Sequence, residues 1–171
     1  QSQAAAEDAN ARRLDRLVDA GGELVREAMK NPDFEAATLE QLADIYGENG
    51  KVTKWSQLGI TMPTETSDEI VRISRQNSSG TYSYFRDIVL GPEGSYKLGS
   101  NDLHGSKDVV DTVEKTPGAI GYSGLAYATD HVKVVPVSTN GGAPVAATTV
   151  TAVDGSYPIA RPLFMYTAGE P

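Results

Sequence analysis

The stretch Arg75-Gln76-Asn77-Ser78-Ser79-Gly80-Thr81 separates an expected strand from an expected helix, and it decides how the chain is interpreted. Before it, residues 70–74 alternate apolar and polar side chains, which is typical of a strand. After it, residues 81–90 carry aromatic and aliphatic side chains at helical spacing. The sequence therefore predicts a strand, a tight polar turn and the start of a helix, in that order.

The polar turn contains the groups that hold a tetrahedral oxyanion. A helix N-terminus offers unpaired N–H groups, and Gly80 lets the backbone approach a ligand closely. Ser79 and Thr81 add hydroxyl donors, and Arg75 adds a planar guanidinium. Ser and Thr are equally common as N-caps where no ligand binds. From these residues alone, anion binding and simple helix capping are two open interpretations.

An Arg, a short spacer and Ser-Gly-Thr at a strand-to-helix turn resemble the PstS-type periplasmic phosphate-binding proteins that serve ABC transporters. Three further segments are similar to segments of that family, and they follow in the family's order. They are LEQLADIYG with KWSQLG (residues 39–47 and 54–59), PGAIGYSGLAYA (117–128) and YPIARPLFMY (157–166). The resemblance covers about residues 38–167 and is strong because four segments agree in order.

This resemblance implies an α/β fold, a single lobe of a type 2 periplasmic-binding-protein-like fold with an added N-terminal helical segment. We expect that segment at residues 1–37 and the phosphate-binding lobe at residues 38–171. The four segments belong to the family's second lobe. No counterpart is found for the first lobe's own phosphate-cradling helix start, or for its acidic residue that accepts a proton from phosphate. The chain is expected to be half a receptor, a fragment or a lobe adapted to another task.

The family resemblance further implies extracytoplasmic binding of inorganic phosphate, linked to uptake through an ABC permease. The expected ligand-binding residues are Arg75, Ser79, Gly80 and Thr81. A first lobe, a second copy or a partner chain would complete the site, and phosphate and sulfate should be poorly distinguished. The alternative function is a structural or interaction subunit that keeps the fold within a larger assembly.

No enzyme, cofactor or metal is expected. A nucleophilic serine would need a base and an orienting acid, and no such set can be assembled. His104 and His131 lack the spacing of a zinc site. A formal net charge of −8 argues against nucleic acid as a partner. With 171 residues and 39% hydrophobic content, the chain is long enough for one globular domain with a sizeable core.

The rest of the chain predicts alternating elements. Trp55 is expected as a buried anchor, and Tyr122 is expected to pack behind the turn rather than to line the pocket. Thr38 with Gln41 predicts a capping box at the start of a helix that ends at Gly47. Two further helical regions are expected: an amphipathic helix or helix pair over 4–29, and a helix at 106–115 capped by Ser106. A polar loop is expected at 95–105. Strands are expected at 119–122, 132–137 and 159–167, with a strand or extended loop at 145–153.

Overall fold

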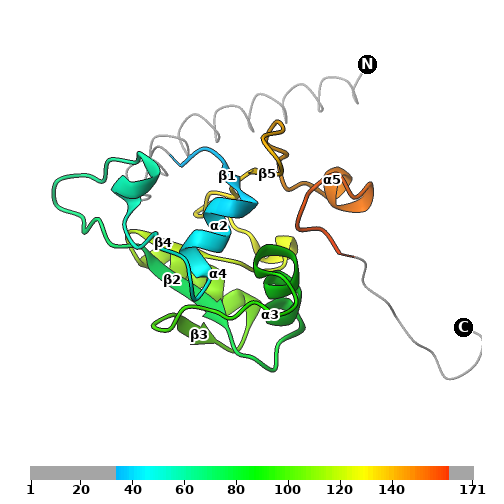
Figure 1. Ribbon diagram of the computed structural model, residues 1–171, viewed down its shortest axis with the longest axis horizontal. Helices are drawn as coiled ribbons and strands as arrows, with labels where there is room; N and C mark the ends of the chain where they lie inside the picture. The colour runs from blue at the N-terminus through cyan, green and yellow to red at the C-terminus, as the bar shows by residue number, and fades with distance from the viewer. Residues whose placement is uncertain (1–33, 162–171) are drawn as a thin grey trace, which may run out of the picture.

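The computed structural model describes residues 34–161, in which parallel strands alternate with helices (Figure 1). The larger sheet has the strand order β3-β2-β4, formed by β2 (Val71–Arg75), β3 (Asn101–Leu103) and β4 (Ala119–Gly121). A second parallel pair joins β1 (Ala37–Thr38) to β5 (Val137–Ser138). The predicted α/β class is therefore confirmed, and the described residues form a single lobe.

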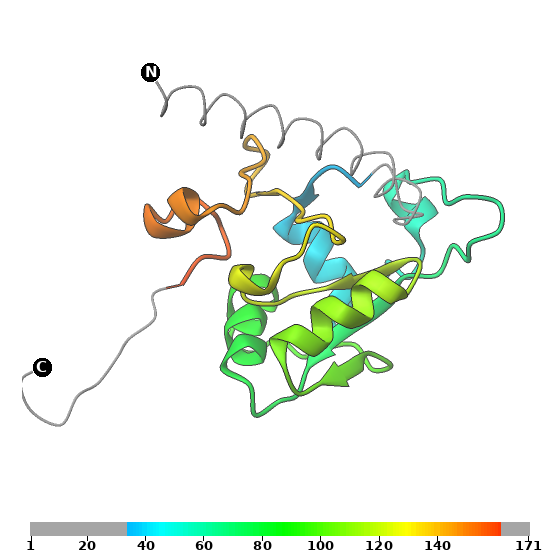
Figure 2. The ribbon, with the colours of Figure 1, turned by 180° about the vertical axis from the view of Figure 1, so that it is seen from behind.

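Helices lie on both faces of the larger sheet. Figures 1 and 2 show α4 (Ser106–Lys115) across one face and α2 (Leu39–Tyr46) toward the other. The predicted strand, turn and helix around residue 75 are confirmed. The helix begins as α3 (Gly80–Phe85) and continues as the π-helical turn η2 (Arg86–Leu90). The short helices are η1 (Trp55–Leu58), η3 (Leu125–Tyr127) and α5 (Thr149–Val153).

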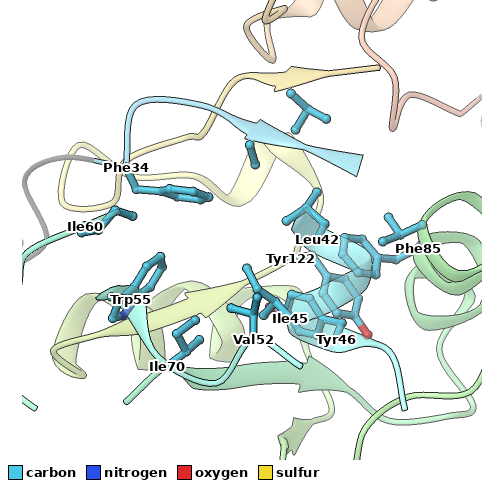
Figure 3. Close-up of a cluster of buried hydrophobic side chains, with 13 residues drawn as sticks. Phe34, Leu42, Ile45, Tyr46, Val52, Trp55, Ile60, Ile70, Phe85 and Tyr122 are labelled. Atoms are coloured by element: carbon cyan, nitrogen blue, oxygen red, sulfur yellow. The ribbon is translucent and has the colours of Figure 1, made fainter. Parts of the chain in front are cut away.

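The main hydrophobic core contains an aromatic cluster between α2, α3 and the sheet (Figure 3). The rings of Phe85 and Tyr122 stack with centroids 3.9 Å apart, and Tyr46 meets both edge-on. Trp55 is 1% exposed, packs against Phe34, and donates from Nε1 to the Gly118 carbonyl at 3.0 Å. The expected buried anchor is thus confirmed. Burying one such ring contributes about 1.5–3 kcal/mol.

Local sequence explains where α2 begins and ends. The Thr38 hydroxyl accepts the Gln41 N–H at 3.0 Å, and the Gln41 side chain accepts the Thr38 N–H at 2.9 Å. This reciprocal pair satisfies two N–H groups that a helix start otherwise leaves unpaired. Gly47 ends the helix, and its N–H donates to the Ala43 carbonyl. The predicted capping box and helix end are both confirmed.

Three predictions about the strands and the start of α4 were wrong. Residues 95–105 are not all loop, because Asn101–Leu103 pairs with β2 as an edge strand. The N-cap of α4 is Gly105 rather than Ser106, and the Asp108 carboxylate accepts the Gly105 N–H at 3.1 Å. Residues 132–137 do not form a full strand, since only Val137–Ser138 pairs in parallel with another strand.

The segment after β5 also differs from the expectation. Residues 145–153 end in the helix α5, which begins where the Thr148 hydroxyl accepts the Thr151 N–H at 3.1 Å. Residues 159–161 are not a strand, and residues 162–167 lie outside the described residues. The expected helix over 4–29 also lies outside them. The domain boundary between residues 37 and 38 stays a prediction.

Candidate anion-binding site

The candidate site lies where the three strands of the larger sheet end. Because the strands are parallel, their carboxyl ends meet at one edge, and this edge is where α/β proteins most often bind ligands. The turn 76–79 follows β2, residues 104–105 follow β3, and residues 122–124 follow β4. These three loops supply the polar groups described below.

Ser79 caps α3. Its hydroxyl accepts the Thr81 N–H at 3.2 Å, and its carbonyl accepts the Ser83 N–H at 3.1 Å. The capping interpretation of Ser79 is therefore confirmed. The Gly80 and Tyr82 N–H groups find no acceptor among residues 34–161. These two donors, in the first turn of the helix, are the ones available to an incoming oxyanion.

Gly80 lies exposed at the start of α3. Its φ is not positive, so Gly80 is not needed here for an unusual backbone conformation. What a glycine provides at this position is room for a ligand to come close to the backbone. Apart from its chain neighbours and the backbone of its own helix, a Cβ atom at this position would meet only Arg161 within 4 Å, at 3.6 Å from Nη1 and 3.8 Å from Nη2. The space above the Gly80 backbone is therefore bordered by a guanidinium.

Arg75, the last residue of β2, is held by the loop between β3 and α4. Its Nε and Nη2 donate to the His104 carbonyl at 3.2 and 2.7 Å, and its Nη1 donates to the Ser106 hydroxyl at 2.7 Å. The structure thus places all four predicted residues in one strand-to-helix connection, but ties the Arg75 side chain to the neighbouring loop. A second N–H on each terminal nitrogen is left for a ligand.

Tyr122 lies behind the turn, as expected, and is 9% exposed. Its hydroxyl lies 2.7 Å from that of Ser74, accepts the Arg75 N–H at 3.4 Å and donates to the Tyr96 hydroxyl at 3.1 Å. Burial raises the pKa of Tyr122 above its ordinary value, so the hydroxyl stays protonated at neutral pH. Tyr122 therefore holds the end of β2 in place from the core side.

Sequence reasoning missed Arg161, Tyr84 and the loop that fixes Arg75. The Arg161 guanidinium lies 5.5 Å from the centre of the Tyr84 ring, and the Tyr84 hydroxyl donates to the Ala160 carbonyl. Arg161 belongs to one of the segments that carried the family resemblance, YPIARPLFMY, but nothing in that segment predicts its neighbour in space. Only the fold brings residue 161 beside residue 80.

Between residues 34 and 161, no group of three or more His, Asp or Glu side chains is arranged to hold a metal ion. In the same range, no helix is both long enough and apolar enough to cross a membrane.

The sequence profile of the PBP superfamily domain matches residues 19–171 of the chain. The phosphate-binding protein PstS of Pseudomonas aeruginosa is 32% identical over 150 residues, which cover 83% of this chain. PstS of Staphylococcus saprophyticus is 34% identical over 142 residues, which cover 81%. The crystal structure of a possible phosphate binding protein from Planctomyces limnophilus superposes with a TM-score of 0.63 at 28% identity over 74% of this chain.

These matches cover only part of each relative. The chain spans 46% of the Pseudomonas protein, 42% of the Staphylococcus protein and 46% of the Planctomyces chain. It is therefore similar to somewhat less than half of each of these proteins.

Proposed function

Because this chain belongs to the PBP superfamily, we propose that it is a PstS-type lobe that binds inorganic phosphate outside the cytoplasm. The proposed ligand contacts are the hydroxyls of Ser79 and Thr81, the Gly80 N–H and the Arg75 guanidinium. The lobe binds the anion without chemistry upon it, and it takes part in phosphate uptake by delivering the ligand to an ABC permease.

One observation carries this proposal: the first turn of α3 presents free N–H groups at the carboxyl edge of a parallel sheet, with Arg75 fixed beside it. Hydrogen bonds from N–H groups and guanidinium to an oxyanion are charge-assisted and about twice as strong as neutral ones. Arg75 is also preorganised, since the His104 carbonyl already fixes its plane. Little ordering then remains to be done when phosphate arrives.

The proposed site covers the anion from one side. In such a lobe the far side of the phosphate stays hydrated, and hydrogen bonds in water contribute less than in a closed cleft. We propose that a first lobe, a second copy of the chain or a partner chain supplies the opposite wall. Affinity of the lobe alone is accordingly expected to be weak.

A thermal shift assay tests the proposal. Phosphate that binds only the folded state raises the melting temperature by mass action. We expect a rise that saturates with phosphate concentration, and its loss in Arg75→Ala. Arg86→Ala is the matched control, because this substitution removes the same positive charge. Arg86 is paired with Asp87 on η2. Equal shifts in both variants would reject the assignment of Arg75.

The alternative, a structural or interaction subunit, is favoured by a different observation. An apolar cavity of about 250 Å³ lies between β4, the 132–137 segment and the residues around Tyr157. A lobe used for assembly would cover such a surface with another chain. Under this alternative, phosphate leaves the melting temperature unchanged, and light scattering shows an oligomer. A phosphate-responsive monomer would reject it.

A further inference from the structure

We propose that Arg161 is a second guanidinium of the anion site, lying beside the first turn of α3 and binding the same tetrahedral oxyanion as Arg75. This inference rests on the proposed function and adds a residue outside the Arg75–Thr81 turn. Its ligand class is a tetrahedral dianion, such as phosphate. The evidence lies in the position of Arg161, in what holds it there, and in the charges around it.

The position of Arg161 is set by α3. Its two terminal nitrogens lie 3.6 and 3.8 Å from where a Gly80 Cβ would be, and the Gly80 N–H has no acceptor among residues 34–161. The planar fork of N–H donors on a guanidinium matches two oxygens of one tetrahedral anion. An oxyanion bound to the Gly80 N–H would therefore meet Arg161.

Tyr84 holds Arg161 in this place. One turn along the same helix, its ring lies under the guanidinium at 5.5 Å, and its hydroxyl donates to the carbonyl of the preceding residue, Ala160. A cation over an aromatic face is attracted by the ring's quadrupole, which favours this position of the guanidinium. Arg161 is exposed, so the ring and the Ala160 contact, rather than burial, fix the guanidinium.

The charges near the turn are unbalanced. Residues 34–161 form three ion pairs, which are Lys54–Glu69, Arg86–Asp87 and Lys107–Asp111. Neither Arg75 nor Arg161 takes part in any of them. In a chain of net charge −8, two arginines that pair with no carboxylate of residues 34–161, beside N–H groups that have no acceptor in the same range, make a local site for an anion. The second guanidinium also supplies part of the wall that a single lobe otherwise lacks.

Calorimetric titration of the full chain with inorganic phosphate at low salt tests this inference. We expect Arg161→Gln to raise the dissociation constant at least tenfold, as expected for the loss of a charge-assisted contact. Arg86→Gln removes the same charge from η2, the continuation of α3, and is expected to change the dissociation constant less than twofold. Both positions lie at the surface, and circular dichroism will establish that both variants fold.

The outcomes distinguish the role of Arg161 from phosphate binding by the lobe. A tenfold loss in Arg161→Gln alone supports a direct contact. Equal effects of the two substitutions, or no effect of either, reject the role of Arg161 while phosphate binding by the lobe stands. If the unaltered chain gives no saturable heat, the proposed function fails and the assignment of Arg161 falls with it.

Discussion

The hydroxyl groups of Ser74 and Tyr122 lie 2.7 Å apart in the core, although 48 residues separate them in the chain. Ser74 ends the buried part of β2, directly before Arg75, and Tyr122 directly follows β4. Tyr122 donates onward to Tyr96, which donates to the Tyr82 carbonyl in the first turn of α3. One chain of hydrogen bonds therefore links both ends of the candidate anion-binding turn.

Tyr122→Phe is expected to loosen that turn. The change leaves the Ser74 and Tyr96 hydroxyls without their shared partner while keeping the stacked ring. Leaving buried polar groups unpaired costs about 1–3 kcal/mol of unfolding free energy. Urea unfolding followed by the fluorescence of Trp55, the single tryptophan, measures it. Tyr127→Phe, at a 52% exposed position, is the control. Equal stability of both variants would contradict the account.

Gly80→Ala is expected to separate stability from binding. The φ at Gly80 is ordinary and the new methyl group meets only Arg161 at van der Waals distance, so the unfolding free energy should change by less than about 1 kcal/mol. The methyl group would occupy the space above the Gly80 N–H, and phosphate affinity should fall at least tenfold. Ser83→Ala, on the same helix, is the control for calorimetry. Unchanged affinity in Gly80→Ala would exclude close approach to this backbone.

Gly121→Ala is expected to destabilise the lobe. A Cβ atom there would lie 2.9 Å from Val109 Cγ1 and 2.9 Å from Val113 Cγ2, both on α4. Overpacking of this kind costs about 1–3 kcal/mol, because α4 must shift from the sheet. Gly124→Ala, whose Cβ would meet Tyr127 no closer than 3.4 Å, is the matched control. Urea midpoints that agree within error for the two variants would show that α4 lies farther from β4.

Alkaline pH is expected to unfold the protein through its buried tyrosines. Burial is the main cause that raises the pKa of Tyr46, Tyr96 and Tyr122 above the ordinary value near 10. Above about pH 10 the unfolded chain loses these protons while the folded protein keeps them, so the unfolding free energy falls as pH rises. Below that pH the buried, protonated tyrosines contribute fully to the unfolding free energy. Tyr46→Phe should flatten the decline, and an unchanged slope would contradict it.

Sulfate is expected to compete with phosphate. Among the described residues, no carboxylate forms a hydrogen bond or ion pair with Arg75, Ser79, Gly80 or Thr81. A site made only of donors binds both dianions, and the two dissociation constants should agree within about tenfold. Competition calorimetry measures both. Strong rejection of sulfate would reveal an acidic acceptor near the turn.

The sequence predicted the parts of the fold that local chemistry determines. The alternation in residues 70–74, the Thr38 capping box and the Ser79 cap each act within a few residues, and all three are observed. The edge strand Asn101–Leu103 was missed because its residues are polar and exposed, so its pairing with β2 rather than its pattern defines it. The helix α5 was missed because its Thr and Val residues favour strands. Thr148 and Thr151 were its only local signal.

The candidate site also combines residues that are close in sequence with residues that only the fold brings together. Arg75, Ser79, Gly80 and Thr81 are neighbours in sequence, so one motif placed them together. His104 and Ser106, which orient Arg75, come from another strand and helix. Arg161 reaches Gly80 from the far end of the described chain. Such contacts depend on the packing of the whole lobe, and no spacing in the sequence encodes them.

The most direct test of the account is an amide chemical-shift titration of the full ¹⁵N-labelled chain with inorganic phosphate. We predict saturable shifts of the Gly80 and Tyr82 amides, with smaller ones at Arg75 and Ser79, and none in the 132–137 segment. A titration that leaves the Gly80 amide unmoved, or that moves only residues away from the β2–α3 turn, would contradict the claim that this turn holds the anion.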